Sequence, residues 1–189
     1  MPNEALLIMD MQNGIVERFA EQADPLLETL ASVLDAARKE NMSIIFVRVA
    51  FRPGAPEASP RNTSFSALSQ SDAFSESAHS TQIHPRVAPR DNEIVVVKRR
   101  VSAFSGSDLE TVLRAQGVDS LVLTGIATSG VVLSTVRQAA DLDFTLTVLS
   151  DVCADADSEV HRVLTEKVFV RQAMVMTAQE WMSLRTQNP

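Results

Sequence analysis

The 189-residue chain has few of the features that mark specialised protein classes. Its single cysteine, Cys153, rules out an intrachain disulfide, which suggests a reducing cytoplasm. No apolar run approaches the roughly 18–20 residues of a membrane span, and the N-terminus lacks the basic and apolar regions of a signal peptide. The net charge is −7 and no basic run exceeds Lys98–Arg99–Arg100, which argues against nucleic acid or an anionic membrane as a partner. We therefore expect a cytoplasmic globular protein.

Several functional motifs are missing as well. The chain has no Gly-rich phosphate loop and no GxSxG elbow, so nucleotide binding and serine-hydrolase chemistry lack support. His79 and His84 lie in a polar stretch and His161 lies in a predicted helix, and no two of them are spaced with carboxylates as metal ligands are. We expect neither a metal nor a cofactor.

Short apolar runs alternate with helical patterns along the chain, which predicts a parallel sheet covered by helices on both faces. The length suits one domain over residues 1–189. The expected strands are residues 5–9, 43–50, 93–97, 120–123, 144–149 and 173–176. The expected helices are residues 25 to about 41, 107–115, 128 to about 141, about 157–169, and a last one from 177.

Local signals predict where some helices begin. Pro25 is expected at the first position of its helix, where a missing N–H has no cost. Ser107 with Glu110, and Thr177 with Glu180, have the spacing of capping boxes.

Residues 51–92 differ from the rest of the chain. This stretch holds most of the prolines and many serines, with little apolar periodicity. A loop of this length in a compact domain is usually functional or partly disordered. We interpret it as a cover over the site, with a short helix near Phe65–Leu68, and a mobile surface insertion is the alternative.

The chain is organised around residues 121–139, which read LVLTGIATSGVVLSTVRQA. An apolar run ends at Thr124–Gly125 and a helical pattern follows, so we expect a buried strand that turns tightly into a helix. Such a turn places free backbone N–H groups and the positive end of the helix dipole at the carboxyl edge of the sheet. Thr128 is the expected N-cap of this helix.

Two charged residues stand at the predicted ends of buried strands. Asp10 directly follows an apolar run, where a carboxylate is either a site residue or a cap for a loop. Lys98 ends another run, where it is either a site residue or a side chain that extends to solvent. Arg99 and Arg100 are interpreted as surface charges or substrate contacts.

Three segments, in order, resemble the isochorismatase-like hydrolases, which include nicotinamidases, N-carbamoylsarcosine amidases and isochorismatases. They read LLIMDMQNGI with Asp10, VVVKRRVSAFSGSDL with Lys98, and TGIATSGVVLST. The resemblance extends from Ala5 to about Trp181. It implies a three-layer α/β/α Rossmann-like fold whose six parallel strands have the order 3-2-1-4-5-6. Ligands bind at the switch point of such a sheet.

The resemblance also implies roles for particular residues. The nucleophilic cysteine of the amidases falls on Val131, whose alkyl group cannot attack a substrate. The matching Asp10 would act as general base or acid, and Lys98 would orient it together with a substrate oxygen. The pocket and oxyanion region, with an unusual cis peptide between its first two residues, would be formed by Ile126, Ala127, Thr128, Ser129 and Gly130. The histidines that nicotinamidases use for metal have no counterpart in AFRPGAPEASPRN.

Other nucleophiles are not expected to replace the cysteine. Ser129 points elsewhere on the first turn, and Ser134 lies roughly 4.5 Å further along the helix axis. Cys153 is most simply a small buried residue.

Two function classes stay open. The first is a hydrolase that acts on a small metabolite by Asp/Lys acid–base chemistry, with vinyl-ether hydrolysis as the precedent that the resemblance supplies. Arg52, Arg61 and Arg86 could then anchor a dicarboxylate. The second is a catalytically inactive member that binds a small ligand or serves as an interaction subunit. In either case the resemblance implies a homodimer or homotetramer.

Overall fold

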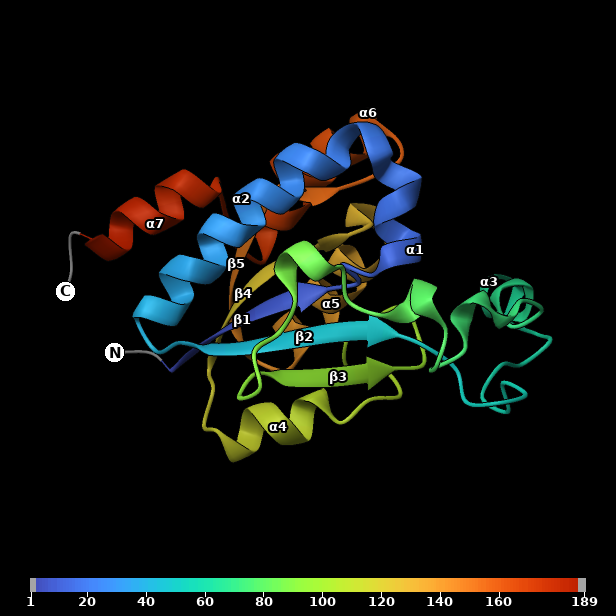
Figure 1. The fold of residues 1–189 in the computed structure, drawn as a ribbon. Coiled ribbons are helices and arrows are strands. Elements are labelled where there is room, and N and C mark those ends of the chain that lie inside the picture. The colour runs from blue at the N-terminus through green and yellow to red at the C-terminus, as the bar shows by residue number, and fades with distance from the viewer. Residues whose placement is uncertain (1–2, 187–189) are drawn as a thin grey trace.

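A six-stranded parallel sheet forms the centre of the molecule (Figure 1). The computed structural model describes residues 3–186. The strand order β3-β2-β1-β4-β5-β6 confirms the predicted order, and every neighbouring pair is parallel. The strands are β1 (Glu4–Met9), β2 (Ser43–Val49), β3 (Ile94–Lys98), β4 (Ser120–Ile126), β5 (Thr145–Ala154) and β6 (Met174–Met176).

Helices cover both faces of this sheet, which gives three layers (Figure 1). They are α1 (Asn13–Val16), α2 (Ala20–Lys39), α3 (Thr63–Leu68), α4 (Leu109–Ala115), α5 (Leu133–Asp141), α6 (Ser158–Val163) and α7 (Ala178–Thr186). Helices α2 and α7 pack on one face, and α4 and α5 pack on the other. Between residues 3 and 186, no helix is both long and apolar enough to cross a membrane.

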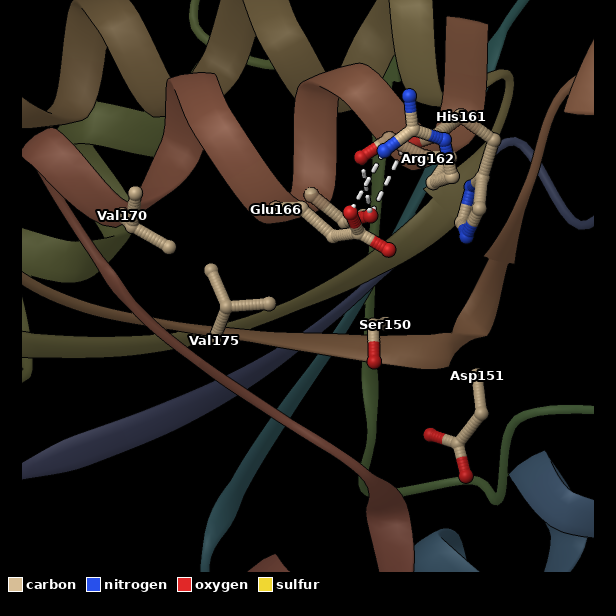
Figure 2. Close-up of a pocket in the computed structure, with 8 residues that line it drawn as sticks. Ser150, Asp151, His161, Arg162, Glu166, Val170 and Val175 are labelled. Carbon is tan, nitrogen blue, oxygen red and sulfur yellow. Dashed lines mark hydrogen bonds and ion pairs between the residues drawn. The ribbon is translucent and has the colours of Figure 1, made fainter. Parts of the chain in front are cut away.

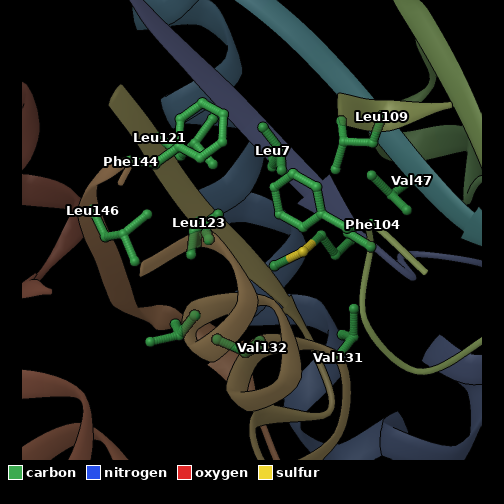
Figure 3. Packing of buried hydrophobic residues seen from close by; sticks show 14 of the residues in the cluster. Leu7, Val47, Phe104, Leu109, Leu121, Leu123, Val131, Val132, Phe144 and Leu146 are labelled. Carbon is green, nitrogen blue, oxygen red and sulfur yellow. The ribbon is translucent and has the colours of Figure 1, made fainter. Parts of the chain in front are cut away.

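The strand β1 shows how the sequence divides the core between the two faces. Ala5, Leu7 and Met9 belong to the cluster beneath α4 and α5 (Figure 3). Leu6 and Ile8 belong to the cluster beneath α2 and α7. Successive side chains of a strand point to opposite faces, so a strand buried on both faces needs consecutive apolar residues. This requirement is why a short apolar run was a reliable signal for β1.

The strands β1 and β4 approach closely at the point where β1 ends. Met9 is paired with Gly125, and a Cβ atom added to Gly125 would lie 2.7 Å from the Met9 carbonyl oxygen. No real Cβ atom tolerates that contact, so only glycine fits here. This close approach brings the turn after β4 beside the residue after β1, which is Asp10.

Two strands run further than their turn signals predicted. β4 extends through Thr124 and Gly125 to Ile126, and β5 extends past Ser150 to Ala154. The expectation that these strands end at residues 123 and 149 is therefore wrong. A register shift between Leu123 and Gly125 absorbs the irregularity, and parallel pairing then resumes.

The start of α2 also corrects a prediction. The helix begins at Ala20, so Pro25 lies inside it rather than at its first position. A proline there leaves the carbonyl four residues earlier without its helical N–H partner. The preceding segment is already helical from Asn13 and packs Val16 and Phe19 against the core, which favours continuing the helix across the proline.

One of the two expected capping boxes forms. The backbone N–H of Thr177 donates to the Glu180 carboxylate (2.7 Å), and the N–H of Glu180 donates back to the Thr177 hydroxyl (3.2 Å). The other does not form, because the Ser107 hydroxyl donates to the Ala103 carbonyl (2.6 Å) and Asp108 takes the N-cap position.

The 51–92 stretch contains the expected short helix, α3, and leads from the carboxyl end of β2 to the amino end of β3 (Figure 1). Phe51, Phe65 and Phe74 form a small core of its own. Its later part lies against the chain after Asp10, where the Gln12 amide group donates to the Thr81 carbonyl (2.9 Å). The stretch is therefore anchored beside the end of β1.

Two arginines after Lys98 fasten the same stretch. The Arg99 guanidinium forms ion pairs with Glu57 (3.2 Å) and Glu76. The Arg100 guanidinium donates to the Glu57 carbonyl (2.8 Å) and stacks on Phe65 at 5.4 Å. Most of these contacts are with the 51–92 stretch, and Arg99 also donates to the Ala50 carbonyl.

Candidate active site

Asp10 is the residue at which β1 ends, and its backbone turns the chain sharply. Its φ angle is 59°, in the left-handed region that aspartate tolerates better than most residues. Its backbone N–H donates to the Val47 carbonyl at 2.8 Å. The residue is only 5% exposed, so the carboxyl group is buried at the carboxyl edge of the sheet.

Lys98 lies against Asp10. Its Nζ atom is 2.8 Å from Oδ2 of Asp10, and both side chains are buried. The same ammonium donates to the carbonyls of Arg100 (3.1 Å) and Val101 (2.9 Å). All three N–H groups of Lys98 are thus engaged, and contact with a substrate oxygen requires one of these bonds to break. The structure brings the two residues together as expected, while their catalytic roles stay a prediction.

The second carboxylate oxygen of Asp10 has no partner. Oδ1 is buried, and no hydrogen bond reaches it from any residue between 3 and 186. Burial raises the pKa of the Asp10 carboxyl group above its ordinary value of 3.8, and the positive charge of Lys98 opposes this only in part. Asp10 therefore holds a proton at higher pH than an exposed aspartate does.

The turn after β4 has the shape that the resemblance implied, with one correction. The peptide bond between Ile126 and Ala127 is cis. The next five residues form a π-helical turn, η5 (Thr128–Val132), before α5 begins. The expected N-cap, Thr128, is wrong, because Ala127 takes that position. The Thr128 hydroxyl pairs instead with Nδ1 of His161 at 2.8 Å.

Val131 is 2% exposed and belongs to the hydrophobic cluster that also contains Phe104. Figure 3 shows it at the margin of that cluster, below Phe104 in this view. Its alkyl side chain fills space in the core and offers no lone pair for attack on a substrate.

None of the other candidate nucleophiles is activated. Cys153 is 5% exposed, and burial raises its pKa to about 12, so the thiolate is scarcely populated at neutral pH. In the described range, no hydrogen bond joins the hydroxyl of Ser129 or Ser134 to a base. No three His, Cys, Asp or Glu side chains of residues 3–186 converge as metal ligands would.

The sequence did not identify two residues that lie at this edge of the sheet. Asp155 accepts a hydrogen bond from the backbone N–H of Ser129 at 2.6 Å, and His161 pairs with Thr128. From the sequence, His161 is expected only to lie in a helix and to bind no metal. The available signal for Asp155 was its place just after the fifth strand, but the turn signals at residues 150–151 hid where that strand ends.

The three arginines considered as dicarboxylate anchors have partners of other kinds. Arg52 pairs with Glu57 (3.3 Å) and Arg86 pairs with Asp24 (2.6 Å). Arg61 forms no ion pair inside the described range. No contact ties any of them to Asp10, so their role as anchors stays a prediction.

The comparison with known proteins agrees with this geometry. A family model, the isochorismatase domain, matches residues 4–180. The chain belongs to the isochorismatase family. An uncharacterised isochorismatase family protein of Bacillus subtilis, YwoC, is 32% identical over 178 residues, which cover 94% of this chain and 92% of that protein. A solved structure of an isochorismatase family protein from Burkholderia thailandensis superposes with a TM-score of 0.83 at 26% identity, covering 97% of this chain and 95% of the other.

Other relatives in the isochorismatase family differ in their stated activity. A ureidoacrylate amidohydrolase, RutB of Stutzerimonas stutzeri, is 31% identical over 82% of this chain and 71% of its own length. An Arabidopsis thaliana protein named "Probable inactive nicotinamidase" is 28% identical over 84% of each chain. Family membership therefore does not determine whether a member is an active amidase.

Proposed function

We propose that this chain is a hydrolase that acts on a small metabolite by acid–base chemistry at Asp10, without a cysteine nucleophile. The observation that carries the proposal is the Asp10 carboxyl group. Lys98 holds one of its oxygens, and the other is buried with no partner among residues 3–186. An unsatisfied buried acceptor costs about 1–3 kcal/mol. This cost is relieved when the oxygen carries a proton that it shares with a bound molecule, or when it accepts a hydrogen bond from that molecule.

Vinyl-ether hydrolysis is the reaction that suits this group best. Asp10 in its acid form donates a proton to the terminal vinyl carbon, and an oxocarbenium ion forms. Water adds to that cation and returns a proton to Asp10, and the hemiketal then collapses to a ketone and an alcohol. The raised pKa of Asp10 favours the acid form at the start, and Lys98 stabilises the carboxylate left after the proton has gone.

Val131 supports the absence of a covalent step. The resemblance places the amidase nucleophile at this position, and a buried alkyl group there cannot form an acyl-enzyme. Protonating a vinyl ether needs an acid and water but no nucleophilic side chain. An acid retained without a thiol fits that chemistry.

One observation favours the alternative, an inactive member that binds a ligand or a partner protein. All three N–H groups of Lys98 are engaged within the protein. A purely structural lysine would have the same contacts. The two proposals therefore differ in whether Asp10 exchanges a proton with a bound molecule.

Turnover of a panel of small vinyl ethers and small amides, followed by mass spectrometry, tests the proposal. We expect turnover of a vinyl ether and none of the amides. Asp10→Asn should lower the vinyl-ether rate by at least about 100-fold, the usual contribution of a general acid. The matched control is Asp143→Asn. Asp143 also has a left-handed φ, of 64°, and is exposed, and it lies away from the carboxyl edge of the sheet because it precedes β5.

Two results would count against the proposal that Asp10 catalyses a hydrolysis. Vinyl-ether turnover that survives Asp10→Asn removes Asp10 from the chemistry. A chain that binds panel members and turns over none of them is the inactive member. We also propose a homodimer or homotetramer, as the resemblance implied, which sedimentation velocity at micromolar concentration checks directly.

A further inference from the structure

We propose that Asp155 and His161 are positioning residues that fix the shape of the turn η5, an inference that rests on the proposed function because that turn borders the Asp10 site. Neither residue is placed at the reacting atoms. Both act on the backbone and side chain of residues 128 and 129, immediately after the cis peptide bond.

The turn has no effective cap of its own. Ala127 stands at the N-cap position and has no polar side chain. Thr128 is fully buried, and among residues 3–186 the only side chain that pairs with its hydroxyl is His161, at 2.8 Å. A buried hydroxyl without a partner is costly, so the position of His161 determines where the Thr128 side chain lies.

Asp155 makes the second contact. Its Oδ2 atom accepts from the Ser129 N–H at 2.6 Å, and its Oδ1 atom lies 3.5 Å from the Asp157 N–H. The residue is 7% exposed, and no cation of residues 3–186 forms an ion pair with it. The backbone N–H groups and the positive end of the helix dipole are what stabilise this buried carboxylate.

The two contacts continue the pairing of β4 and β5 beyond the ends of the strands. Ile126 is paired with Ala154, the residue just before Asp155. Asp155 directly follows β5 and His161 lies in α6, so both positioning residues come from the chain after β5, on one side of β4. Asp10 follows β1, which lies on the other side of β4. The turn is thus held by contacts from the chain after β5, while β1 pairs with the other side of β4.

His161 joins this arrangement to the surface. It lines an open groove of about 540 Å³ together with Ser150, Asp151 and Glu166 (Figure 2). Burial lowers the pKa of His161, so its ring is neutral at neutral pH. A neutral ring can accept the Thr128 proton at Nδ1.

A thiol installed in the turn can report its shape without any substrate. The parent protein carries Val131→Cys and Cys153→Ala, and the measurement is the rate of alkylation by iodoacetamide as a function of pH. Thr128→Val and Asp155→Ala, each added to this parent, should change the limiting alkylation rate by about fivefold, the factor that one lost hydrogen bond represents. Thr128→Ser, which keeps the hydroxyl, should restore the parent rate.

Asp155→Asn separates hydrogen bonding from charge. Its amide oxygen can still accept from the Ser129 N–H, so the limiting rate should stay that of the parent. Removing a nearby negative charge should move the midpoint of the pH profile downward. Hydrogen exchange at the Ser129 amide is measured without the Val131→Cys and Cys153→Ala changes. Relative to the native chain, exchange should be faster in Asp155→Ala and equally slow in Asp155→Asn.

The control for a merely structural role is Thr124→Val. Thr124 is also fully buried, and its hydroxyl donates to the Leu7 carbonyl at 3.0 Å. This variant should lose stability and leave thiol reactivity unchanged. The inference is overturned if Thr128→Val and Asp155→Ala, like Thr124→Val, lose stability and leave thiol reactivity unchanged. If Asp155→Ala fails to fold, the test is the alkylation rate of Thr128→Val compared with that of Thr128→Ser.

The failure of the proposed function has a different signature. In that case the parent thiol titrates like an ordinary cysteine, near pH 8.5. The inference is judged by differences between each variant and that parent, whatever the parent value is.

Discussion

The pair formed by Asp10 and Lys98 predicts an asymmetric response to mutation. The two groups are 2.8 Å apart and almost fully buried. Attraction at that distance is about 6 kcal/mol if the effective dielectric constant is about 20, but burying the charges offsets it. Because burial raises the pKa of Asp10 in spite of Lys98, the buried carboxylate is less favourable for folding than its protonated form.

Lys98→Met should therefore be the costly change. It leaves a buried carboxylate without its cation, which costs about 3–5 kcal/mol. Asp10→Asn should change the stability by no more than about 1 kcal/mol, because the amide resembles the favoured neutral acid in shape and can still accept from Lys98. In the Asp10→Asn background, Lys98→Met loses three hydrogen bonds, two to carbonyls and one to the new amide, about 3 kcal/mol in total. The expected coupling is thus about 1 kcal/mol.

The sign of the pH dependence follows from the same carboxyl group. A folded-state pKa above 3.8 means that Asp10 contributes its full stability below that value and loses it as the pH rises through the folded pKa. Lys98→Met removes the cation that opposes the shift. Its stability deficit should therefore be smaller at pH 5 than at pH 7, and the double variant should lack this difference.

Urea unfolding of the four proteins at both pH values gives the coupling energy directly. The control pair is Arg162 with Glu159, which is solvent-exposed and should show no measurable coupling. A coupling below about 0.5 kcal/mol for Asp10 and Lys98 would mean that the ion pair is energetically unimportant. Equal losses for the two single variants would show that the Asp10 charge stabilises the fold.

Three further predictions concern the rest of the chain. Cys153 should react with thiol reagents only after unfolding, because it is buried with a pKa raised to about 12, and a mass shift in the native protein within minutes would contradict this. Gly125→Ala should destabilise the fold by about 2 kcal/mol or more, measured as a lower urea midpoint, because its Cβ would lie 2.7 Å from the Met9 carbonyl oxygen. Arg185→Ala should free α7, since Arg185 forms ion pairs with Glu4 in β1 and with Glu40 after α2, and the expected result is a red-shifted tryptophan fluorescence in the native protein with a loss of about 1–2 kcal/mol. An unchanged emission spectrum would show that these ion pairs are not what holds the helix.

The fold was accessible from the sequence because interior parallel strands require consecutive apolar residues. That requirement located β1, β2 and β4, and the family resemblance supplied the strand order. The strand ends were less accessible. Thr124 and Gly125 resemble a turn locally, yet their backbone pairs with β1. Whether a residue ends a strand depends on what lies beside it, and the local sequence does not contain that information.

The same distinction applies to the site. Asp10 and Lys98 could be predicted because each directly follows or ends an apolar run. The role of Thr128 could not, because a threonine hydroxyl near a helix start can cap the helix or bond elsewhere. Its partner, His161, is 33 residues away along the chain. Asp155 lies among several acidic residues, and nothing in that run distinguishes the one that reaches Ser129.

The energetics of Asp10 and Val131 point in opposite directions, and that contrast bears on function. Val131 is an apolar residue in an apolar environment, which favours folding and needs no functional explanation. Asp10 is a charge in a buried position with an oxygen that no described residue satisfies, which disfavours folding. If only the stability of the fold mattered, an apolar residue would be as suitable at position 10 as valine is at position 131. A site that keeps the costly acid, with an alkyl group where the resemblance implies the nucleophile, fits a reaction that needs a proton donor and no thiol. The stability of Asp10→Asn bears on this argument, because a variant that is as stable as the native chain and inactive shows that the carboxylate serves the chemistry rather than the fold.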